Sequence, residues 1–212
     1  MTEEFLILVD SNDNPVGTEE KVKCHLPNGK LHRAFTVLLF NKEGKLLLTR
    51  RSQSKMLWPG DWDGTVASHP RKTETYVSSA ERRLPEEIGA SCNLDYLFKF
   101  EYHVPYKDIG SENEICGTLI GQVPDSFQIK LVQDEISETK WAGLDLFSDI
   151  EKNPQDYCPW MLVALYFLAE SDKQMIQKHK AIFDKWMNLQ YKAILAKSLK
   201  YHFPTNNWRL LN

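Results

Sequence analysis

Two short stretches of the 212-residue chain combine residue types that suit metal and phosphate chemistry. Residues 62–70 are mostly small and lead to His69, and residues 82–89 follow with Arg83 and Glu87. Arg83 and Glu87 are four positions apart, so on a helix they project from the same face. A guanidinium beside a carboxylate suits a site for a metal ion and a phosphate together, although the same spacing also occurs in solvent-exposed ion pairs.

Three histidines and two glutamates make a second candidate site. His25 and His32 lie in a polar segment that we expect to be a loop. Glu112 and Glu114 share a face if they lie on a strand. With His69 they supply three imidazoles and two carboxylates, a set suited to five- or six-coordinate Mn²⁺, Zn²⁺ or Mg²⁺. Taken singly, the histidines also fit ordinary core or exposed positions, and the glutamates fit an exposed strand end.

The residues after His69 resemble the Nudix box. Glu74, Arg82, Glu86, Glu87 and Gly89 fit this motif, and Ser68 takes the place of its first glycine. Arg83 stands where a Nudix hydrolase carries a metal-binding glutamate. This departure points away from pyrophosphate hydrolysis and toward the type I isopentenyl diphosphate isomerases, a branch of the same superfamily.

The resemblance to these isomerases extends from about residue 4 to about residue 170. It rests on six motifs in the same order along the chain: His25/His32, Trp58-Pro59-Gly60, His69-Pro70, Arg82/Arg83/Glu87, Glu112/Glu114 and Pro159-Trp160-Met161. The family converts isopentenyl to dimethylallyl diphosphate by protonating one face of the alkene and deprotonating the other. The resemblance therefore implies an enzyme of isoprenoid and terpenoid biosynthesis that acts through a carbocation.

The same resemblance implies a role for each matching residue. Glu114, assisted by Tyr102, would transfer protons, and Trp160 would offer a π face to the cation, although a core tryptophan is equally typical there. One divalent ion would be bound by His25, His32, His69, Glu112 and Glu114. Glu87 would help to hold a Mg²⁺ that arrives with the diphosphate. The diphosphate itself would be bound by Lys21, Arg51, Lys55 and Arg83.

The chain departs from the family at its second proton-transfer group. The family has a cysteine two positions before the motif histidine, and this chain has Ala67, whose methyl group neither donates nor accepts a proton. The family usually has Thr-Asn where this chain has Asp63-Gly64, so Gly64 and Ala67 are both expected to widen the pocket. The alternatives are a terpene cyclase or prenyltransferase for a longer prenyl diphosphate, a non-catalytic prenyl diphosphate binder, and a Nudix hydrolase.

Apolar patterns and turn residues predict the elements that carry these side chains. Strands are expected over 5–9, 34–40, 45–50, 94–104, 114–123 and 138–142, and helices over 76–88, 144–152, 159–171 and 172–200. This order predicts an α+β fold, an α/β/α sandwich with a Nudix-like mixed sheet between helices. Residues 1–171 would form the isomerase domain, and 172–212 a C-terminal amphipathic helical extension. That helix would pack on its own domain, form a dimer face or lie on a membrane.

Composition is ordinary for a soluble globular protein. The net charge of −3 calls for neither a nucleic-acid nor a membrane partner, and no apolar run has the length of a membrane span. The acidic start differs from a signal peptide, and the four widely spaced cysteines fit reduced thiols. We therefore expect a cytoplasmic monomer or homodimer whose partner is a prenyl diphosphate.

Overall fold

The computed structural model describes residues 4–124, 126–170 and 179–211. Within these residues, ten strands form one mixed sheet: β1 (Phe5–Val9), β2 (Pro15–Glu20), β3 (His32–Phe40), β4 (Leu46–Arg51), β5 (Trp62–Asp63), β6 (Val66–Ser68), β7 (Asp95–Tyr106), β8 (Gly110–Gln122), β9 (Ile136–Ala142) and β10 (Trp208–Leu211). The helices are α1 (Lys21–His25), α2 (Tyr76–Ile88), α3 (Leu146–Lys152), the 3₁₀ turn η1 (Pro154–Asp156), α4 (Pro159–Glu170), α5 (Lys180–Trp186) and α6 (Leu189–His202).

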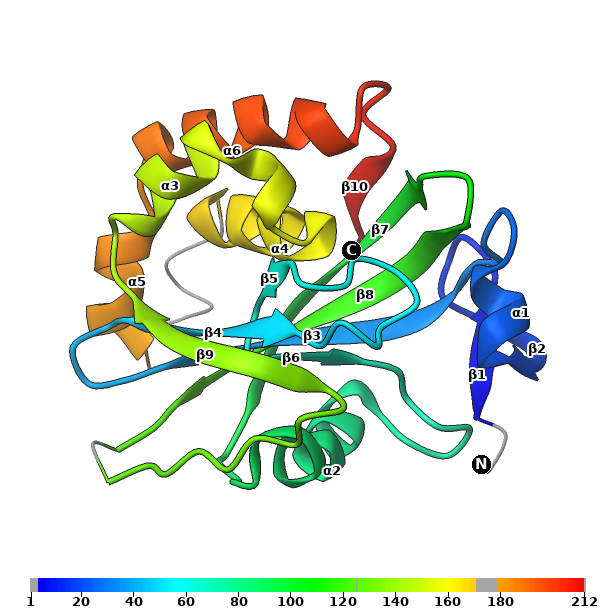
Figure 1. Cartoon of the computed structure of the whole chain (residues 1–212), viewed down its shortest axis with the longest axis horizontal. Helices are drawn as coiled ribbons and strands as arrows, with labels where there is room; N and C mark the ends of the chain where they lie inside the picture. The colour runs from blue at the N-terminus through cyan, green and yellow to red at the C-terminus, as the bar shows by residue number, and fades with distance from the viewer. Residues whose placement is uncertain (1–3, 125, 171–178, 212) are drawn as a thin grey trace.

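The sheet lies between two helical layers, with α2 on one side and α3, α4 and α6 on the other (Figure 1). The central strand β3 shows why both faces are covered. Its side chains alternate, so that Val37 and Leu39 enter the core beneath α2 while Leu38 and Phe40 enter the core beneath α4. A strand buried on both faces reads as a continuous apolar run. The predicted α+β sandwich is confirmed.

Helix α2 has the bounds that the sequence predicts. Thr75 and Ser78 form a capping box at its start, and Gly89 ends it in the left-handed conformation with φ of 67°. The helix continues through Pro85, although an interior proline removes a backbone donor. Its position is held by a buried apolar stripe that includes Leu84.

The predicted turn connects β3 to β4, but the two strands diverge directly next to it. They pair only at Phe40 and Leu46. Strand β3 instead runs parallel to β8 along its whole length, from His32 opposite Glu114 to Phe40 opposite Gln122. The consequence for the site is direct, because this parallel register sets a predicted metal-binding histidine beside a predicted metal-binding glutamate.

The expectation of a loop over residues 21–32 is wrong for its first part. Lys21–His25 form the short helix α1, in which Cys24 and His25 are buried. His32 is also not in a loop, because it begins β3.

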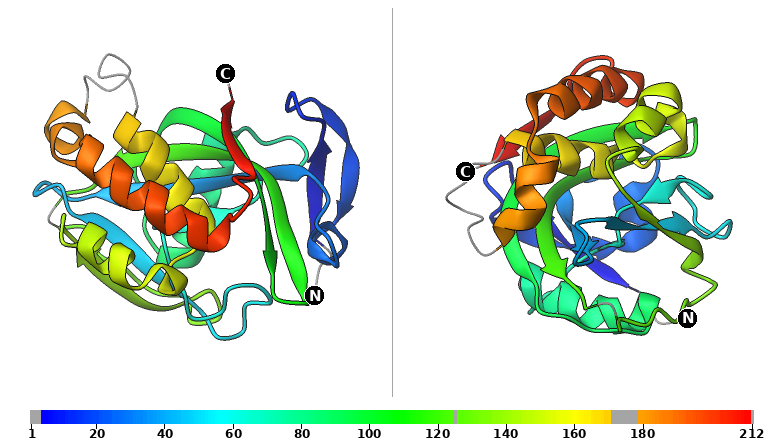
Figure 2. Two further views of the ribbon diagram at one scale, coloured as in Figure 1. Left: turned by 90° about the horizontal axis from the view of Figure 1, so that it is seen from above. Right: turned by 90° about the vertical axis from the view of Figure 1, so that its left-hand side faces the viewer.

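The single helix predicted over 172–200 is also wrong. Two helices occupy the described part, and Asn188 starts the second by accepting a 2.9 Å hydrogen bond from the backbone N–H of Gln190. The predicted domain boundary after residue 171 lies outside the described residues. Helix α6 packs on α3 and α4 and buries Leu195 and Leu199, which confirms that it packs on its own domain (Figure 2).

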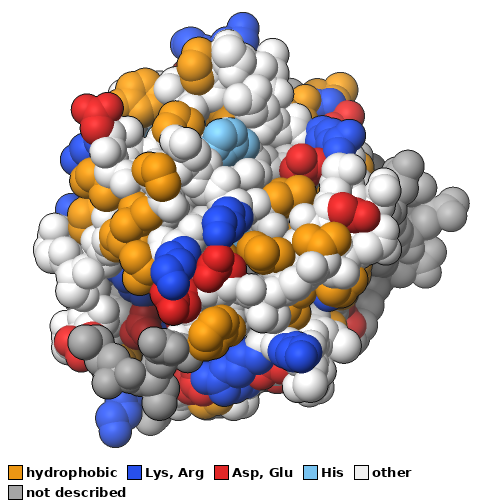
Figure 3. Space-filling model, turned by 90° about the vertical axis from the view of Figure 1, so that its right-hand side faces the viewer, with side chains coloured by type: hydrophobic (Ala, Val, Ile, Leu, Met, Phe, Trp, Pro, Cys, Tyr) orange, Lys and Arg blue, Asp and Glu red, His pale blue; other side chains and the backbone are white. Residues whose placement is uncertain are grey.

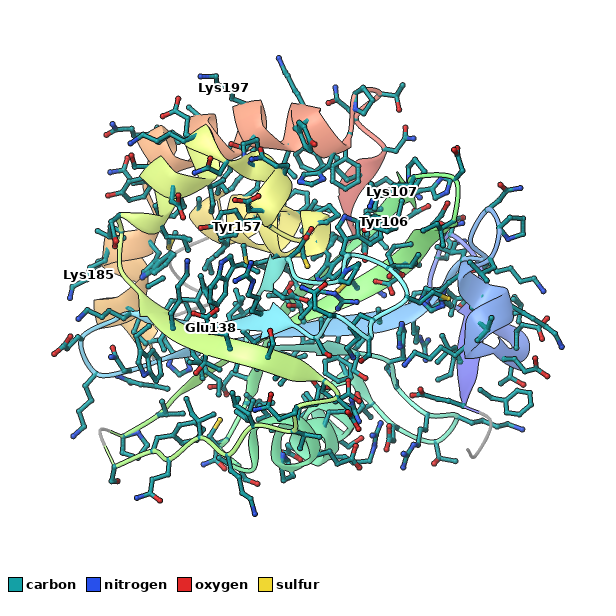
Figure 4. All side chains as sticks on the ribbon, in the orientation of Figure 1. Tyr106, Lys107, Glu138, Tyr157, Lys185 and Lys197 are labelled. Atoms are coloured by element: carbon teal, nitrogen blue, oxygen red, sulfur yellow. The ribbon has the colours of Figure 1, made fainter. Side chains whose placement is uncertain are left out.

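The chain ends on the sheet rather than on a helix. Strand β10, which the sequence patterns did not predict, pairs antiparallel with β7 and brings Trp208 opposite Tyr102. The outer side of α6 faces solvent, and Figure 4 shows Lys197 projecting outward from it. No described helix is long and apolar enough to cross a membrane. On the face formed by α1 and the β1–β2 hairpin, apolar, positive and negative side chains are interspersed (Figure 3).

Candidate active site

Four buried side chains from four separate segments converge beside the parallel β3–β8 pair. His25 ends α1, His32 begins β3, His69 follows β6, and Glu114 lies in β8. One nitrogen or oxygen atom of each lies within 4.8 Å of those of the other three. A tight group of imidazoles and a carboxylate is typical of a divalent metal site.

Backbone carbonyls orient two of the imidazoles. Nδ1 of His25 donates to the carbonyl oxygen of Lys21 at 2.6 Å, and Nδ1 of His32 donates to that of Lys30 at 2.7 Å. Because a carbonyl oxygen only accepts, each Nδ1 carries the ring hydrogen. Each Nε2 therefore faces the cluster, the orientation that metal-binding histidines usually show.

Glu112 and Glu114 complete the donor set from one face of β8. Oε2 of Glu112 lies 3.0 Å from Nε2 of His25, and Oε1 of Glu114 lies 3.1 Å from Nε2 of His69 and 3.3 Å from Nε2 of His32. Despite these distances, Oε2 of Glu112 and Nε2 of His32 have no well-oriented hydrogen-bond partner. Buried polar atoms without partners call for an explanation, and a divalent ion at this cluster would supply one. Glu112, the fifth predicted ligand, contacts His25 but lies outside the group of four.

The protonation states of His69 and Glu114 suit metal binding, whereas His25 would lose a proton when it binds an ion. Burial holds the pKa of His69 well below its ordinary value, and repulsion from His32 lowers it further. Burial also lowers the pKa of His25, but the Glu112 carboxylate outweighs it and raises that pKa to about 9. Burial raises the pKa of Glu114, yet its interactions with His32, Tyr102 and His25 outweigh it, so the net pKa is lowered. Glu114 is thus a carboxylate and His69 a neutral imidazole at neutral pH, as ligands must be.

Tyr102 lies directly opposite Glu114 in the β7–β8 ladder. Its hydroxyl donates to Oε2 of Glu114 at 2.5 Å, and its side chain is buried. Burial raises the pKa of Tyr102 well above its ordinary value, and the negative charge of Glu114 raises it further. The phenol therefore stays protonated, so the pair can hold and transfer a proton.

A cavity of about 100 Å³ lies next to this pair. Tyr102 and Glu114 line it together with Ala67 on β6 and Trp160 at the start of α4. The indole ring of Trp160 meets that of Trp58 edge-on, with ring centroids 5.3 Å apart. The cavity therefore combines a hydrogen-bonded phenol and carboxylate, an aromatic wall and, at Ala67, a side chain without any polar atom.

Gly64 does not widen this cavity, contrary to expectation. It is not among the lining residues, and a Cβ atom placed on it would meet Oγ1 of Thr36 at 3.1 Å and the carbonyl oxygen of Val37 at 3.2 Å. The missing side chain allows the β5–β6 turn to pack closely on β3. Gly64 and Ala67 are both described residues that were expected to widen the cavity. Of the two, only Ala67 lines it.

The four cations predicted to bind diphosphate all line the cavity: Lys21, Arg51, Lys55 and Arg83. Lys21 pairs with Glu4 at 2.8 Å. Arg51 is held by the loop that follows it, because it donates to the carbonyl oxygens of Leu57 and Trp58. Its remaining amino group, Nη1, lies 3.6 Å from Oδ2 of Asp63.

Lys55 and Arg83 belong to one charged network on the opposite rim. Both contact Glu135, and Arg83 also contacts Glu86 at 2.8 Å and Glu87 at 2.5 Å. The predicted neighbourhood of Arg83 and Glu87 on one face of α2 is confirmed. Glu87 is buried, which raises its pKa despite the opposing charge of Arg83. It lies outside the histidine cluster, so any ion it holds is a separate one.

Two acidic residues here were not predicted from the sequence. A cavity of about 10 Å³ shares Arg51, Lys55 and Ala67 with the main one, and its wall adds Asp63 and Glu135. Asp63 was visible in the sequence as a departure from the family pattern, but only its neighbour Gly64 was interpreted, as a loss of volume. Glu135 lies between elements, where no periodic pattern marks it.

Comparisons with known proteins agree with this geometry. A NUDIX domain family model matches residues 30–161. The chain is 40% identical to the isopentenyl-diphosphate Delta-isomerase of Halorhodospira halophila, and the match covers 74% of this chain and 90% of that protein. It is 35% identical to isopentenyl-diphosphate Delta-isomerase 1 of Photorhabdus laumondii, with the same two coverages.

A solved structure shows the same fold at lower identity. DR0079 from Deinococcus radiodurans is 22% identical, with a TM-score of 0.57 over 70% of this chain and 90% of that one. At this identity the likeness concerns the fold alone, whereas the curated relatives define the family. The chain belongs to the NUDIX superfamily and, within it, to the type I isopentenyl-diphosphate Delta-isomerase family.

Proposed function

We propose that this protein binds a prenyl diphosphate and transfers protons at its alkene, the family reaction being the conversion of isopentenyl to dimethylallyl diphosphate. The observation that carries the proposal is the Tyr102–Glu114 hydrogen bond in the wall of a cavity whose rim holds four cations. A carboxylate and a phenol at the apolar end suit proton transfer to carbon. Cations at the rim suit a diphosphate.

The diphosphate is bound by Lys21, Arg51, Lys55 and Arg83, and Glu87 helps to hold a Mg²⁺ that arrives with it. His25, His32, His69, Glu112 and Glu114 would hold a second divalent ion, Mn²⁺, Zn²⁺ or Mg²⁺. Such an ion supplies positive charge that keeps Glu114 ionised and fixed in place. These assignments rest on donor chemistry and on the convergence of the side chains.

Proton transfer at one face of the alkene falls to Glu114 and Tyr102. The positive charge that develops on carbon lies against the π face of Trp160. The opposite face needs a second acid or base, and Ala67 has none. The isomerisation is therefore slow in this chain unless another group acts in place of the missing thiol.

The main rival is cyclisation of, or prenyl transfer from, a longer allylic diphosphate. The absence of a thiol at Ala67 favours it, because such reactions need no second proton donor at that position. A non-catalytic prenyl diphosphate binder is the remaining alternative.

Product analysis separates these functions. The protein is incubated with Mg²⁺ and isopentenyl, dimethylallyl or geranyl diphosphate, with Glu114→Gln as the control for the proton-transfer pair. We expect slow interconversion of the two five-carbon substrates, lost in the Gln variant. Cyclic or coupled products would support the rival enzyme, inorganic phosphate would indicate a hydrolase, and binding without products would indicate a binder; each of the three contradicts the proposal.

A further inference from the structure

Asp63 is a buried carboxylate directly behind the aromatic wall of the cavity. The indole N–H of Trp160 donates to both of its oxygens at 2.9 Å, and the backbone N–H of Gly64 donates to Oδ1 at 2.6 Å. Only 3% of Asp63 is exposed. Trp160 lines the cavity, whereas Asp63 does not, so the carboxylate acts on the cavity only through other side chains.

Arg51 joins the other two residues. Its Nη1 lies 3.6 Å from Oδ2 of Asp63, and its guanidinium carbon lies 5.1 Å from the centroid of the Trp160 ring. Its other nitrogens are held by the carbonyl oxygens of Leu57 and Trp58. Asp63, Trp160 and Arg51 therefore form one connected cluster in which the indole and the guanidinium face the cavity and the carboxylate lies behind them.

A structural role alone does not require an acid at this position. The family usually has threonine here, and a neutral acceptor satisfies an indole N–H without the cost of burying a charge. A buried anion hydrogen-bonded to the edge of an indole makes the π face more negative and strengthens its attraction for a cation. The buried charge of Asp63 thus lowers the stability of the fold but favours positive charge on the reacting carbon. Active sites often show this exchange of stability for activity.

We propose that Asp63 is a positioning residue that fixes the Trp160 ring across the cavity, strengthens its π face for a cationic carbon and holds Arg51 beside the diphosphate. The inference rests on the proposed function, because it assumes a reaction that develops positive charge next to Trp160. It explains how this chain uses an acid where its family has an alcohol. It assigns Asp63 no contact with the substrate.

The surroundings of Asp63 set the pH range of its charge. Burial raises its pKa to about 6, against the opposing charge of Arg51. The charged and titratable groups that face it from the neighbouring elements are Arg51, Lys55, Glu87, Glu135, Cys158 and Asp61. The carboxylate is therefore ionised above a pH of about 6 and neutral below it.

The first test is kinetic. Asp63→Asn keeps the shape and one acceptor but removes the charge, and Asp63→Thr introduces the usual family residue. We expect each to lower kcat about tenfold per folded active site, and Asn to remove an acidic limb of the pH profile near 6. Asp61→Asn is the matched control, because burial raises the pKa of Asp61 to about 6 as well, and none of its oxygens contacts Trp160.

The second test separates positioning from structural support. Because the pKa of Asp63 is higher in the folded protein than in the unfolded chain, folding disfavours its charged form. Asp63→Asn should therefore melt at a higher temperature than the parent near pH 7.5, and the difference should shrink as the pH falls below 6. A residue that only supports the fold would lower the melting temperature when replaced.

A spectroscopic signal checks the contact without substrate. The Trp160 indole N–H resonance should move with an apparent pKa near 6 in the parent and in Asp61→Asn, but not in Asp63→Asn. If the parent is active and Asp63→Asn keeps both the kcat and the acidic limb of the pH profile, this inference is overturned. The proposed function is then unaffected. A parent that is inactive on all three diphosphates overturns the proposed function, and this inference with it.

Discussion

The hydroxyl of Tyr102 donates to Oε2 of Glu114 at 2.5 Å, and the two residues are direct cross-strand partners on β7 and β8. The other oxygen of the same carboxylate faces His32 and His69. One side chain therefore connects the metal cluster to the cavity wall. A change at Tyr102 should reach the chemistry through Glu114 while leaving the histidines in place.

Tyr102→Phe removes the phenolic donor and keeps the ring. We expect kcat for isopentenyl diphosphate to fall about a hundredfold with little change in KM, because a positioned proton-transfer group contributes roughly 10²–10⁴-fold. Tyr96→Phe on the same strand, where the side chain is 42% exposed, is the control. Steady-state kinetics on both variants checks this, and equal loss in the two would count against a role for the Tyr102 hydroxyl.

Ala67→Cys supplies the group that the family carries at this position. Isomerisation should rise at least about a hundredfold over the parent. Ala67→Ser is the control, because a serine hydroxyl adds similar volume without an ionisable thiol. A parent that already isomerises at a rate typical of the family would contradict our interpretation of Ala67. An inactive Cys variant that still binds metal and diphosphate would favour the longer-chain reaction, and Gly64 would not explain it because it does not line the cavity.

His32→Ala opens the proposed metal site. The side chain is fully buried and its Nε2 lacks a well-oriented partner, so its loss should remove a ligand and sharply lower the bound metal. Elemental analysis of the purified protein measures this directly. His103→Ala is the control, because His103 contacts the carbonyl oxygen of Asn28 outside the cluster. Unchanged metal stoichiometry in His32→Ala would refute the assignment.

Arg83→Glu restores the residue of the hydrolase pattern. It would place another acid beside Glu86, Glu87 and Glu135, which Arg83 now contacts, and should abolish prenyl diphosphate binding. Titration calorimetry checks the affinity, with circular dichroism to establish that the variant is folded. Arg209→Glu is the control, because it breaks a solvent-exposed ion pair on β10. This variant should bind prenyl diphosphate as the parent does. Equal affinity before and after Arg83→Glu would exclude Arg83 from the diphosphate site.

Glu135 should make stability depend on acid pH. Burial raises its pKa, but Lys55 and Arg83 outweigh it and lower the pKa to about 2. A carboxyl with a lowered folded-state pKa stabilises the protein above its unfolded pKa and loses that contribution as the pH falls through its folded pKa. Glu135→Gln should therefore cost about 1–2 kcal/mol near pH 7, after allowance for partial exposure, and progressively less below a pH of about 4.5.

Urea unfolding near pH 7 and near pH 3 measures this difference. Glu138→Gln is the control, because its pair with Arg50 at 3.3 Å is solvent-exposed and should contribute little at either pH. A destabilisation by Glu135→Gln that is the same at both pH values would show that shape, and not charge, determines the contribution of Glu135.

Local patterns in the sequence were enough for much of the fold. Helix α2, with Gly89 after it, follows from a capping residue, an apolar stripe and a residue that tolerates positive φ, all within one segment. The apolar run of β3 predicts a strand buried on both faces. The motif order along the chain was likewise enough to identify the family and to nominate the three histidines and the one glutamate, Glu114, that converge.

Tertiary structure alone decided the features that depend on distant partners. Strand β10 pairs with an edge of β7 that no other described strand occupies, and β3 and β4 separate because β6 pairs with β3 and β9 pairs with β4. The contact between Asp63 and Trp160 joins residues 97 positions apart. Sequence periodicity reports which face of a segment is apolar, but the cost of a buried charge depends on what surrounds it in space. The role of Asp63 could therefore be inferred only after the fold had placed an indole and a guanidinium against it.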